Sequence, residues 1–216
     1  YKVQIAYYES LGMEGMKAYA DTLKAVREAG VPVIADIKRG DIAKTAEMYA
    51  MGHFTGDFES DFVPLAPYMG RTSNGGAKDF EYEKLADGRH VYDLVGDKLN
   101  ALGKDYMGEH GYSSIGLVIG GTHIEEATEI RAKYQDSFFL IPGYGAQGGT
   151  AQGVAGMFDK DGMGALVNSS RGIIGAWKKS GKYSESMSAD DALDLVAESA
   201  REAAKDMRDN LRAVLP

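Results

Sequence analysis

Cysteine is absent from the 216 residues, and several other features that would define a function are also missing. Without cysteine the chain can form neither a disulfide nor a thiolate nucleophile, which fits a cytoplasmic setting. No apolar run is long enough to span a membrane and no signal peptide is visible, so we expect no membrane partner. With a net charge of −8, the chain has no basic surplus for the phosphates of a nucleic acid polymer.

Histidine is scarce and does not show the spacing of metal ligands. We expect the four histidines at the surface or at helix ends; they are His53, His90, His110 and His123.

The remaining composition, 44% hydrophobic and 26% charged, is that of an ordinary globular protein, and we expect a single domain over 1–216. Strand-like segments alternate with segments of helical periodicity, which predicts an α/β fold with a parallel sheet. Predicted strands cover 2–7, 31–38, 62–66, 115–121, 138–141 and 165–168, and predicted helices cover 14–29, 41–51, 90–102, 124–134, 150–158 and 189–214. Buried runs that end in Gly- and Ser-rich loops, without an early G-x-G-x-x-G, favour a closed TIM (β/α)8 barrel, although only about six strands are visible.

The stretch Val33–Thr45 places charges at the end of a buried strand. Because side chains alternate along a strand, Asp36 and Lys38 are predicted to share one face roughly 7 Å apart. Asp41 follows at the start of a predicted helix. Such charges can form a plain salt bridge at the rim of a sheet, but parallel α/β folds place their functional sites at the C-terminal ends of strands. The three charges are therefore the first candidates for catalysis.

Two later segments have the properties of an anion site. Residues 143–149 offer backbone N–H groups with little steric hindrance, and Gln147 adds a side-chain amide. Residues 168–172 end the last predicted strand and place Arg171 over the N-terminus of a helix, where an anion is favoured. Either segment alone could be an ordinary turn, but the loops after the last two strands of a barrel commonly bind phosphate.

Five segments, in this order along the chain, resemble the motifs of orotidine 5′-monophosphate decarboxylases. They are Lys2, the Asp36-x-Lys38-x-x-Asp41-Ile42 run with Thr45, the 72–74 loop, the 142–149 loop and the 168–171 turn. The resemblance covers residues 2 to about 176, and segments 7–9 and 67–70 look most like the type 2 branch. It implies a lyase that converts orotidine 5′-monophosphate to uridine 5′-monophosphate in de novo pyrimidine biosynthesis, without a metal or organic cofactor.

The same resemblance implies roles for the matching residues. Lys38 would protonate C6 of the pyrimidine as carbon dioxide leaves, Asp36 would lie against the substrate carboxylate, and Lys2 would hold the ribose and orient Asp36. The family is homodimeric, and the residues entering the partner's site would be Asp41, Ile42 and Thr45. The pyrimidine would contact Ser73 and Asn74. The phosphate would be held by Pro142, Gln147, Gly148, Ser170 and Arg171.

Two parts of the family pattern have no counterpart in the sequence. The family's first strand carries an Asp that contacts the ribose, whereas nothing precedes Tyr1 here. A helix and a strand normally separate the 67–70 turn from the 72–74 loop, and here one residue does. We expect residues to be missing at both places, which would account for the two strands that the barrel lacks. Gly75 also stands where a proline is common.

Two other functions stay open at this point. A magnesium-dependent sugar-phosphate decarboxylase of the same superfamily, such as one acting on 3-keto-L-gulonate 6-phosphate, shares the Asp-x-Lys-x-x-Asp strand. Loss of activity on chelation would favour it. A catalytically silent nucleotide-binding protein is the second alternative, against which the intact Lys38 and Asp36 speak.

Overall fold

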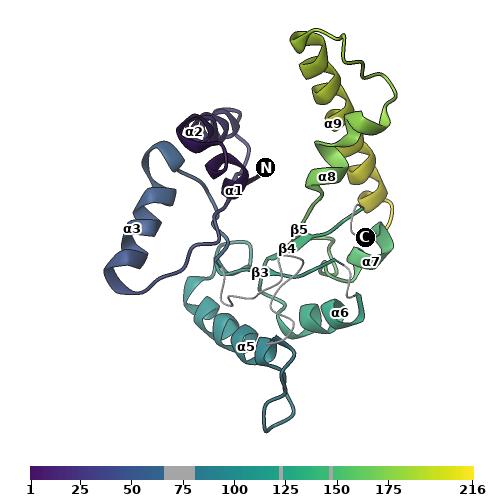
Figure 1. The fold of residues 1–216 in the computed structure, drawn as a ribbon. Coiled ribbons are helices and arrows are strands. Elements are labelled where there is room, and N and C mark those ends of the chain that lie inside the picture. The colour runs from purple at the N-terminus through teal and green to yellow at the C-terminus, as the bar shows by residue number, and fades with distance from the viewer. Residues whose placement is uncertain (66–80, 122–123, 146–147) are drawn as a thin grey trace. The chain divides into compact units, whose positions relative to one another are not determined.

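The structure is a computed structural model that describes residues 1–65, 81–121, 124–145 and 148–216. The chain forms two compact units, Tyr1–Glu83 and Lys84–Pro216 (Figure 1). The named strands pair in parallel in both units, as an α/β fold requires. No helix in the described ranges combines the length and the apolar character needed to cross a bilayer.

The first unit is built on two short parallel strands, β1 (Lys2–Gln4) and β2 (Ile34–Asp36). Its helices are α1 (Ile5–Glu9), α2 (Gly12–Glu28) and α3 (Ala43–Phe54), followed by the 3-10 turn η1 (Gly56–Phe58). The predicted strand over 2–7 is wrong beyond Gln4. The Gln4 side chain accepts a hydrogen bond from the N–H of Ala6 at 3.2 Å and caps a helix there instead.

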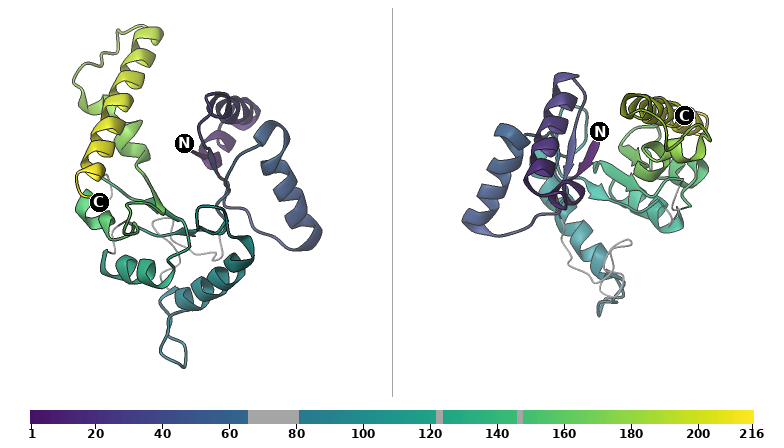
Figure 2. Two further views of the ribbon diagram at one scale, coloured as in Figure 1. Left: turned by 180° about the vertical axis from the view of Figure 1, so that it is seen from behind. Right: turned by 45° about the horizontal axis from the view of Figure 1, so that its top comes forward.

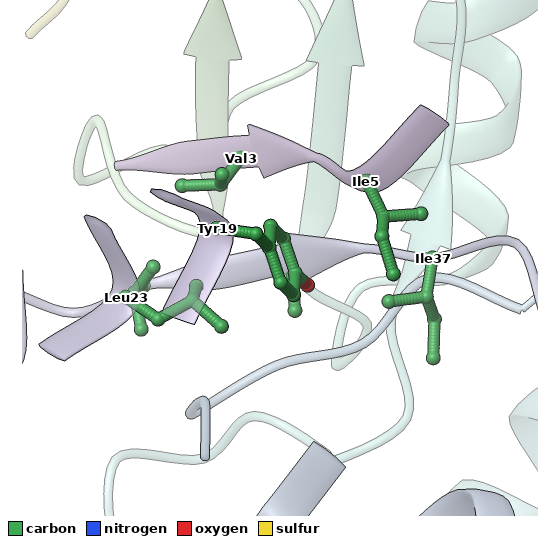
Figure 3. Packing of buried hydrophobic residues seen from close by; sticks show 7 residues of the cluster. Val3, Ile5, Tyr19, Leu23 and Ile37 are labelled. Carbon is green, nitrogen blue, oxygen red and sulfur yellow. The ribbon is translucent and has the colours of Figure 1, made fainter. Parts of the chain in front are cut away.

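The core of the first unit lies between α2 and the two strands. Tyr19 and Leu23 are four residues apart on α2, so they share one face of the helix, and both are fully buried. Figure 3 shows the Tyr19 ring at the centre of this cluster, with Leu23 on one side and Ile5 and Ile37 on the other. The predicted helix over 14–29 is thereby confirmed to within two residues at its start.

The predicted strand over 62–66 is not formed in the described residues. Phe62 and Leu65 make only isolated parallel bridges, to Ile34 and Arg39 respectively. Pro64 lies between them and has no N–H to donate to a ladder, which explains why the pairing does not continue.

The second unit contains the three-stranded parallel sheet β3 (Leu117–Val118), β4 (Phe139–Pro142) and β5 (Ala165–Asn168), in that order. Phe139, Ile141 and Val154 are fully buried in its core. Its helical elements are α5 (Val91–Gly103), η2 (Lys104–Tyr106), α6 (Ile124–Lys133), α7 (Ala151–Ala155), α8 (Ser170–Ile173), η3 (Ala176–Lys179) and α9 (Ala189–Arg212). Figures 1 and 2 show the long helix α9 lying alongside α8.

The second unit differs from the prediction mainly in length. The strand expected over 115–121 is only two residues long. A Cβ atom at Gly116 would lie 2.5 Å from the carbonyl of Phe138, so the chain there approaches its neighbour too closely for a side chain. The helix whose N-terminus is predicted at Arg171 is the short α8, whereas the 3-10 turn η3 was not predicted.

The described histidines lie at the surface or at a helix end, as predicted. His90 is the N-cap residue of α5 and His110 is exposed. His53 lies in the last turn of α3, but it is buried, with 7% of its surface exposed. His53 therefore meets the expectation of the surface or a helix end through its place at the end of α3. His123 lies outside the described residues.

Candidate active site

Asp36 is the centre of the charged cluster in the first unit. It ends β2 and is only 2% exposed. Its Oδ1 faces Lys38 Nζ at 2.5 Å, and its Oδ2 pairs with Lys2 Nζ and accepts a hydrogen bond from Gln4 Nε2 at 2.9 Å. Gln4 on β1 lies directly opposite Asp36 on β2 in the parallel register. The polar side chains of both strands therefore meet at the Asp36 carboxylate.

Lys38 reaches Asp36 from a position beyond the end of β2. Its φ angle is 47°, in the left-handed region that a non-glycine residue adopts at a cost of about 1 kcal/mol or more. β2 ends at Asp36, so the predicted arrangement of both residues on one face of a continuing strand is wrong. The Lys38 side chain remains 56% exposed, and its amine is therefore both paired and accessible.

The charge of this cluster suits a reaction in which negative charge develops. Lys2 and Lys38 supply two ammonium groups against one carboxylate, which leaves one positive charge in excess. The Lys2 side chain is only 16% exposed, so its attraction for an anion is less weakened by water than that of a surface lysine.

Asp41 does not join the cluster through an ion pair with any described residue. Its Oδ1 accepts a hydrogen bond from the N–H of Ile42 at 2.8 Å. Asp41, Ile42 and Thr45 are all exposed, and Ile42 is 81% exposed. These three residues therefore form an exposed surface beside the cluster.

The predicted anion site lies in the second unit, where two loops leave adjacent strands at the same level. Pro142 at the end of β4 lies opposite Asn168 at the end of β5. The Ser169 hydroxyl donates a hydrogen bond to the carbonyl of Tyr144 at 2.8 Å and joins the two loops. The described parts of the 143–149 and 168–172 segments therefore lie side by side, and their binding of an anion stays a prediction.

The loop after β4 uses several of its own N–H groups internally. Gly145 N–H donates to the carbonyl of Gly149 at 2.8 Å, and Gly148 N–H donates to the carbonyl of Gly145 at 2.9 Å. Gly143, Gly145 and Gly148 all have positive φ angles, which this tight loop requires and which other residues rarely adopt. Gly148 would therefore allow a ligand to approach closely, but it would not donate its N–H.

Arg171 is the available cation of this region. It is exposed on α8, directly after Ser170, and its guanidinium forms no hydrogen bond or ion pair with the residues that the structure describes. The Oδ1 atom of Asn168 is buried and also lacks a hydrogen-bond partner within the described ranges. This end of the sheet thus keeps unused polar groups next to the two loops.

Three predicted ligand-binding residues lie outside the described residues; they are Ser73, Asn74 and Gln147. The sequence reasoning missed the roles of Gln4, which holds Asp36, and of Ser169, which ties the loops together. Gln4 could have been found, because it shares a strand face with Lys2. Within the described ranges, no group of three or more His, Cys, Asp or Glu side chains is arranged to hold a metal ion.

Comparisons with known proteins agree with the motifs. The model of the "Orotidine 5'-phosphate decarboxylase / HUMPS family" matches residues 1–185. The orotidine 5′-phosphate decarboxylase of Clostridium perfringens (strain SM101 / Type A) is 52% identical, over all of this chain and 79% of the relative. The enzyme of the same name from Clostridium acetobutylicum is 50% identical over the same shares.

Solved structures support the same relationship. The Leishmania donovani UMP synthase is 30% identical with a TM-score of 0.76, over 99% of this chain and 46% of that chain. The Leishmania donovani OMP decarboxylase is 28% identical with a TM-score of 0.73, over 99% of this chain and 80% of that chain. Such relatives are TIM barrels, so the predicted fold class is confirmed, and the parallel strands described above are consistent with it.

The alignment also bears on the expected gaps. It spans 237 positions against the 216 residues of this chain, so within the aligned region the Clostridium perfringens relative has about 21 residues without a counterpart here. The position near Arg71, where we expect an internal gap, lies outside the described residues. The matched family model and the relatives together establish that the chain belongs to the orotidine 5′-phosphate decarboxylase / HUMPS family.

Proposed function

We propose that this protein decarboxylates orotidine 5′-monophosphate to uridine 5′-monophosphate in pyrimidine biosynthesis. The observation that carries the proposal is the contact of the accessible Lys38 amine with the buried carboxylate of Asp36, which Lys2 holds from the other side. The relatives that share half or more of this sequence have the name of this activity.

The chemistry follows from the charges of the cluster. As the bond between C6 and the carboxylate breaks, its electron pair remains on C6 and carbon dioxide leaves. The ammonium of Lys38 stabilises this charge, which is present only in the transition state and the intermediate. Lys38 then gives its proton to C6 and regains one from water. Asp36 lies against the substrate carboxylate, and Lys2 orients Asp36 and holds the ribose.

The second unit supplies the phosphate contacts in this proposal. Arg171 and Ser170 bind the phosphate from α8, together with the loop residues Pro142, Gln147 and Gly148. The guanidinium of Arg171, which has no partner among the described residues, and the hydrogen bond that joins the two loops support this assignment. Phosphate binding far from C6 positions the pyrimidine rather than breaking its bond. The pyrimidine itself contacts Ser73 and Asn74.

We further propose a cytoplasmic homodimer of single-domain barrels, in which Asp41, Ile42 and Thr45 enter the partner's site. The exposure of all three residues supports this proposal, since a large apolar side chain such as Ile42 is disfavoured in water. The proposed reaction uses neither a metal nor an organic cofactor.

Absorbance-monitored turnover of orotidine 5′-monophosphate, with EDTA present, tests the function. We expect turnover by the wild-type protein and by Lys44→Ala, which removes an exposed lysine of the same unit that pairs with Glu47. Lys38→Ala should lose the activity. Activity that disappears with EDTA would favour the magnesium-dependent sugar-phosphate enzyme. Binding of the nucleotide without turnover would indicate a catalytically silent protein.

A further inference from the structure

The side chain of Arg39 makes two contacts, with the carbonyl of Ile37 and with Glu9, that together we call the clasp. One nitrogen of the Arg39 guanidinium donates a hydrogen bond to the carbonyl of Ile37 at 3.1 Å. The other terminal nitrogen pairs with the carboxylate of Glu9 at 2.5 Å. The side chain of Arg39 therefore folds back past Lys38 and is bound to the residue on its other side.

The clasp includes a hydrogen bond to the peptide that precedes Lys38, the residue whose left-handed backbone brings its amine to Asp36. Lys38 has a φ angle of 47°, which needs support from its surroundings because it is unfavourable for a side chain with a Cβ atom. Ile37 is 2% exposed and cannot move without disturbing the core. A hydrogen bond from Arg39 to the Ile37 carbonyl therefore fixes the peptide just before Lys38 against a rigid residue.

The other end of the clasp connects the two strands of the site. Glu9 is the last residue of α1, which begins directly after β1, the strand that carries Lys2. Arg39 also forms a parallel backbone bridge with Leu65. The residue following Lys38 is thus attached both to the β1–α1 segment and to the chain that passes beside β2.

We propose that Arg39 and Glu9 are positioning residues that hold the backbone of Lys38 so that its amine lies on Asp36. This inference rests on the proposed function, and it adds two residues that do not themselves touch the substrate. An arginine is required because one planar guanidinium donates in two fixed directions, to a carbonyl and to a carboxylate. A lysine has a single ammonium that cannot occupy both places.

The kinetic test compares Arg39→Lys, Arg39→Met and Glu9→Gln with wild type. Because small displacements of a catalytic group cost up to about a hundredfold in rate, we expect kcat to fall about 10- to 100-fold in Arg39→Met. Arg39→Lys should recover little of this loss, and Glu9→Gln should retain more because its amide oxygen can still accept a hydrogen bond. KM for orotidine 5′-monophosphate should change less than about threefold, since the phosphate contacts are untouched.

The matched control is Lys17→Met, which removes an ion pair of the same unit between exposed side chains, that of Lys17 with Asp21. It should leave kcat unchanged. Thermal unfolding of each variant separates a misplaced Lys38 from a loss of folded protein. A fall in kcat that only matches the unfolded fraction, or an equal fall in Lys17→Met, would overturn the proposal.

A second readout does not depend on turnover. Asp36 engages the accessible Lys38 amine, so a water-soluble acylating reagent should modify Lys38 several times faster in Arg39→Met, where this contact is loosened, than in wild type. Peptide mass spectrometry measures this rate, with the exposed Lys44 as the internal reference. Unchanged labelling of Lys38 in both Arg39→Met and Glu9→Gln would refute the clasp. If wild type shows no turnover but the labelling rates differ as expected, the proposed function fails and the positioning stands.

Discussion

Lys38 contacts one oxygen of the Asp36 carboxylate, and Lys2 and Gln4 occupy the other. With partners on both oxygens, the carboxylate cannot rotate without breaking at least one of these contacts. The buried charge is therefore fixed in orientation, as a group that must face a substrate carboxylate needs to be.

Asp36→Asn should destabilise the protein as well as inactivate it. The change removes the buried carboxylate that Lys2 and Lys38 both contact, and it leaves the ammonium of Lys2 largely shielded from water without its partner. We expect the free energy of unfolding to fall by about 3 kcal/mol, as for other broken buried ion pairs. Urea unfolding measures this. The control Asp21→Asn, at an exposed pair, should cost at most about 1 kcal/mol, and equal losses would contradict the prediction.

Arg171→Met should weaken binding of the phosphate and little else. Loss of a charge-assisted contact predicts a rise in KM for orotidine 5′-monophosphate of about tenfold or more. Orotidine, which has no phosphate, should be converted with the same kcat/KM by the variant and by wild type. Arg208→Met removes an exposed arginine that pairs with Asp209, and it should affect neither substrate. An equal loss on both substrates would show that Arg171 acts elsewhere.

Arg131→Met should destabilise the second unit. This buried guanidinium donates hydrogen bonds to the carbonyls of Met157, Ser137 and Gly164 and lies 3.6 Å from the centre of the Phe139 ring. Burial lowers the pKa of Arg131, yet the side chain remains the shared donor for these carbonyls. Because the variant leaves buried acceptors unpaired, we expect a loss of about 3 kcal/mol in the free energy of unfolding.

The measurement for Arg131 is chemical denaturation followed by circular dichroism, with Arg208→Met as the matched control. A buried Arg131→Lys variant should recover only part of the loss, because one ammonium cannot reach the same set of carbonyls. Full stability of Arg131→Met would show that water or neighbouring groups replace the guanidinium.

His53 should make the stability depend on pH. Burial, and then the charge of Arg39, lower the pKa of His53 below 6.5, and its Nδ1 has no hydrogen-bond partner in the described residues. The unfolded chain therefore binds a proton more readily than the folded one. Stability is complete above pH 6.5 and declines as the pH falls from there toward the lowered pKa, by at most about 1.4 kcal/mol per pH unit.

Urea unfolding between pH 5 and 8 tests this dependence, with His53→Gln for comparison. The difference in stability between wild type and variant should shift against the wild type as the pH falls below about 6.5. A difference that stays constant over this range would show that His53 binds protons equally in the folded and unfolded chain.

The sequence predicted what depends on local patterns. The apolar runs located β2, β4 and β5, and the charged residues after β2 identified the cluster around Asp36. The glycines after β4 and Arg171 after β5 predict an anion site that stays a prediction. The left-handed backbone at Lys38 was not predictable from the sequence. This conformation depends on tertiary contacts, and lysine has no intrinsic preference for it. The helical turn after Gln4 was missed for a similar reason. The run 2–7 alternates as a strand would, but the chain turns into a helix after Gln4, whose side chain caps it.

The register of β1 against β2 gives the charged cluster a role in folding fidelity. Lys2 and Gln4 reach Asp36 because they point to the same side of β1, with Gln4 directly opposite the carboxylate. A slip by one residue would turn both away and set the apolar side chain of Val3 against a buried negative charge. Mispaired strands therefore have a higher electrostatic free energy than correctly paired ones. They can dissociate and pair again before the rest of the core has formed.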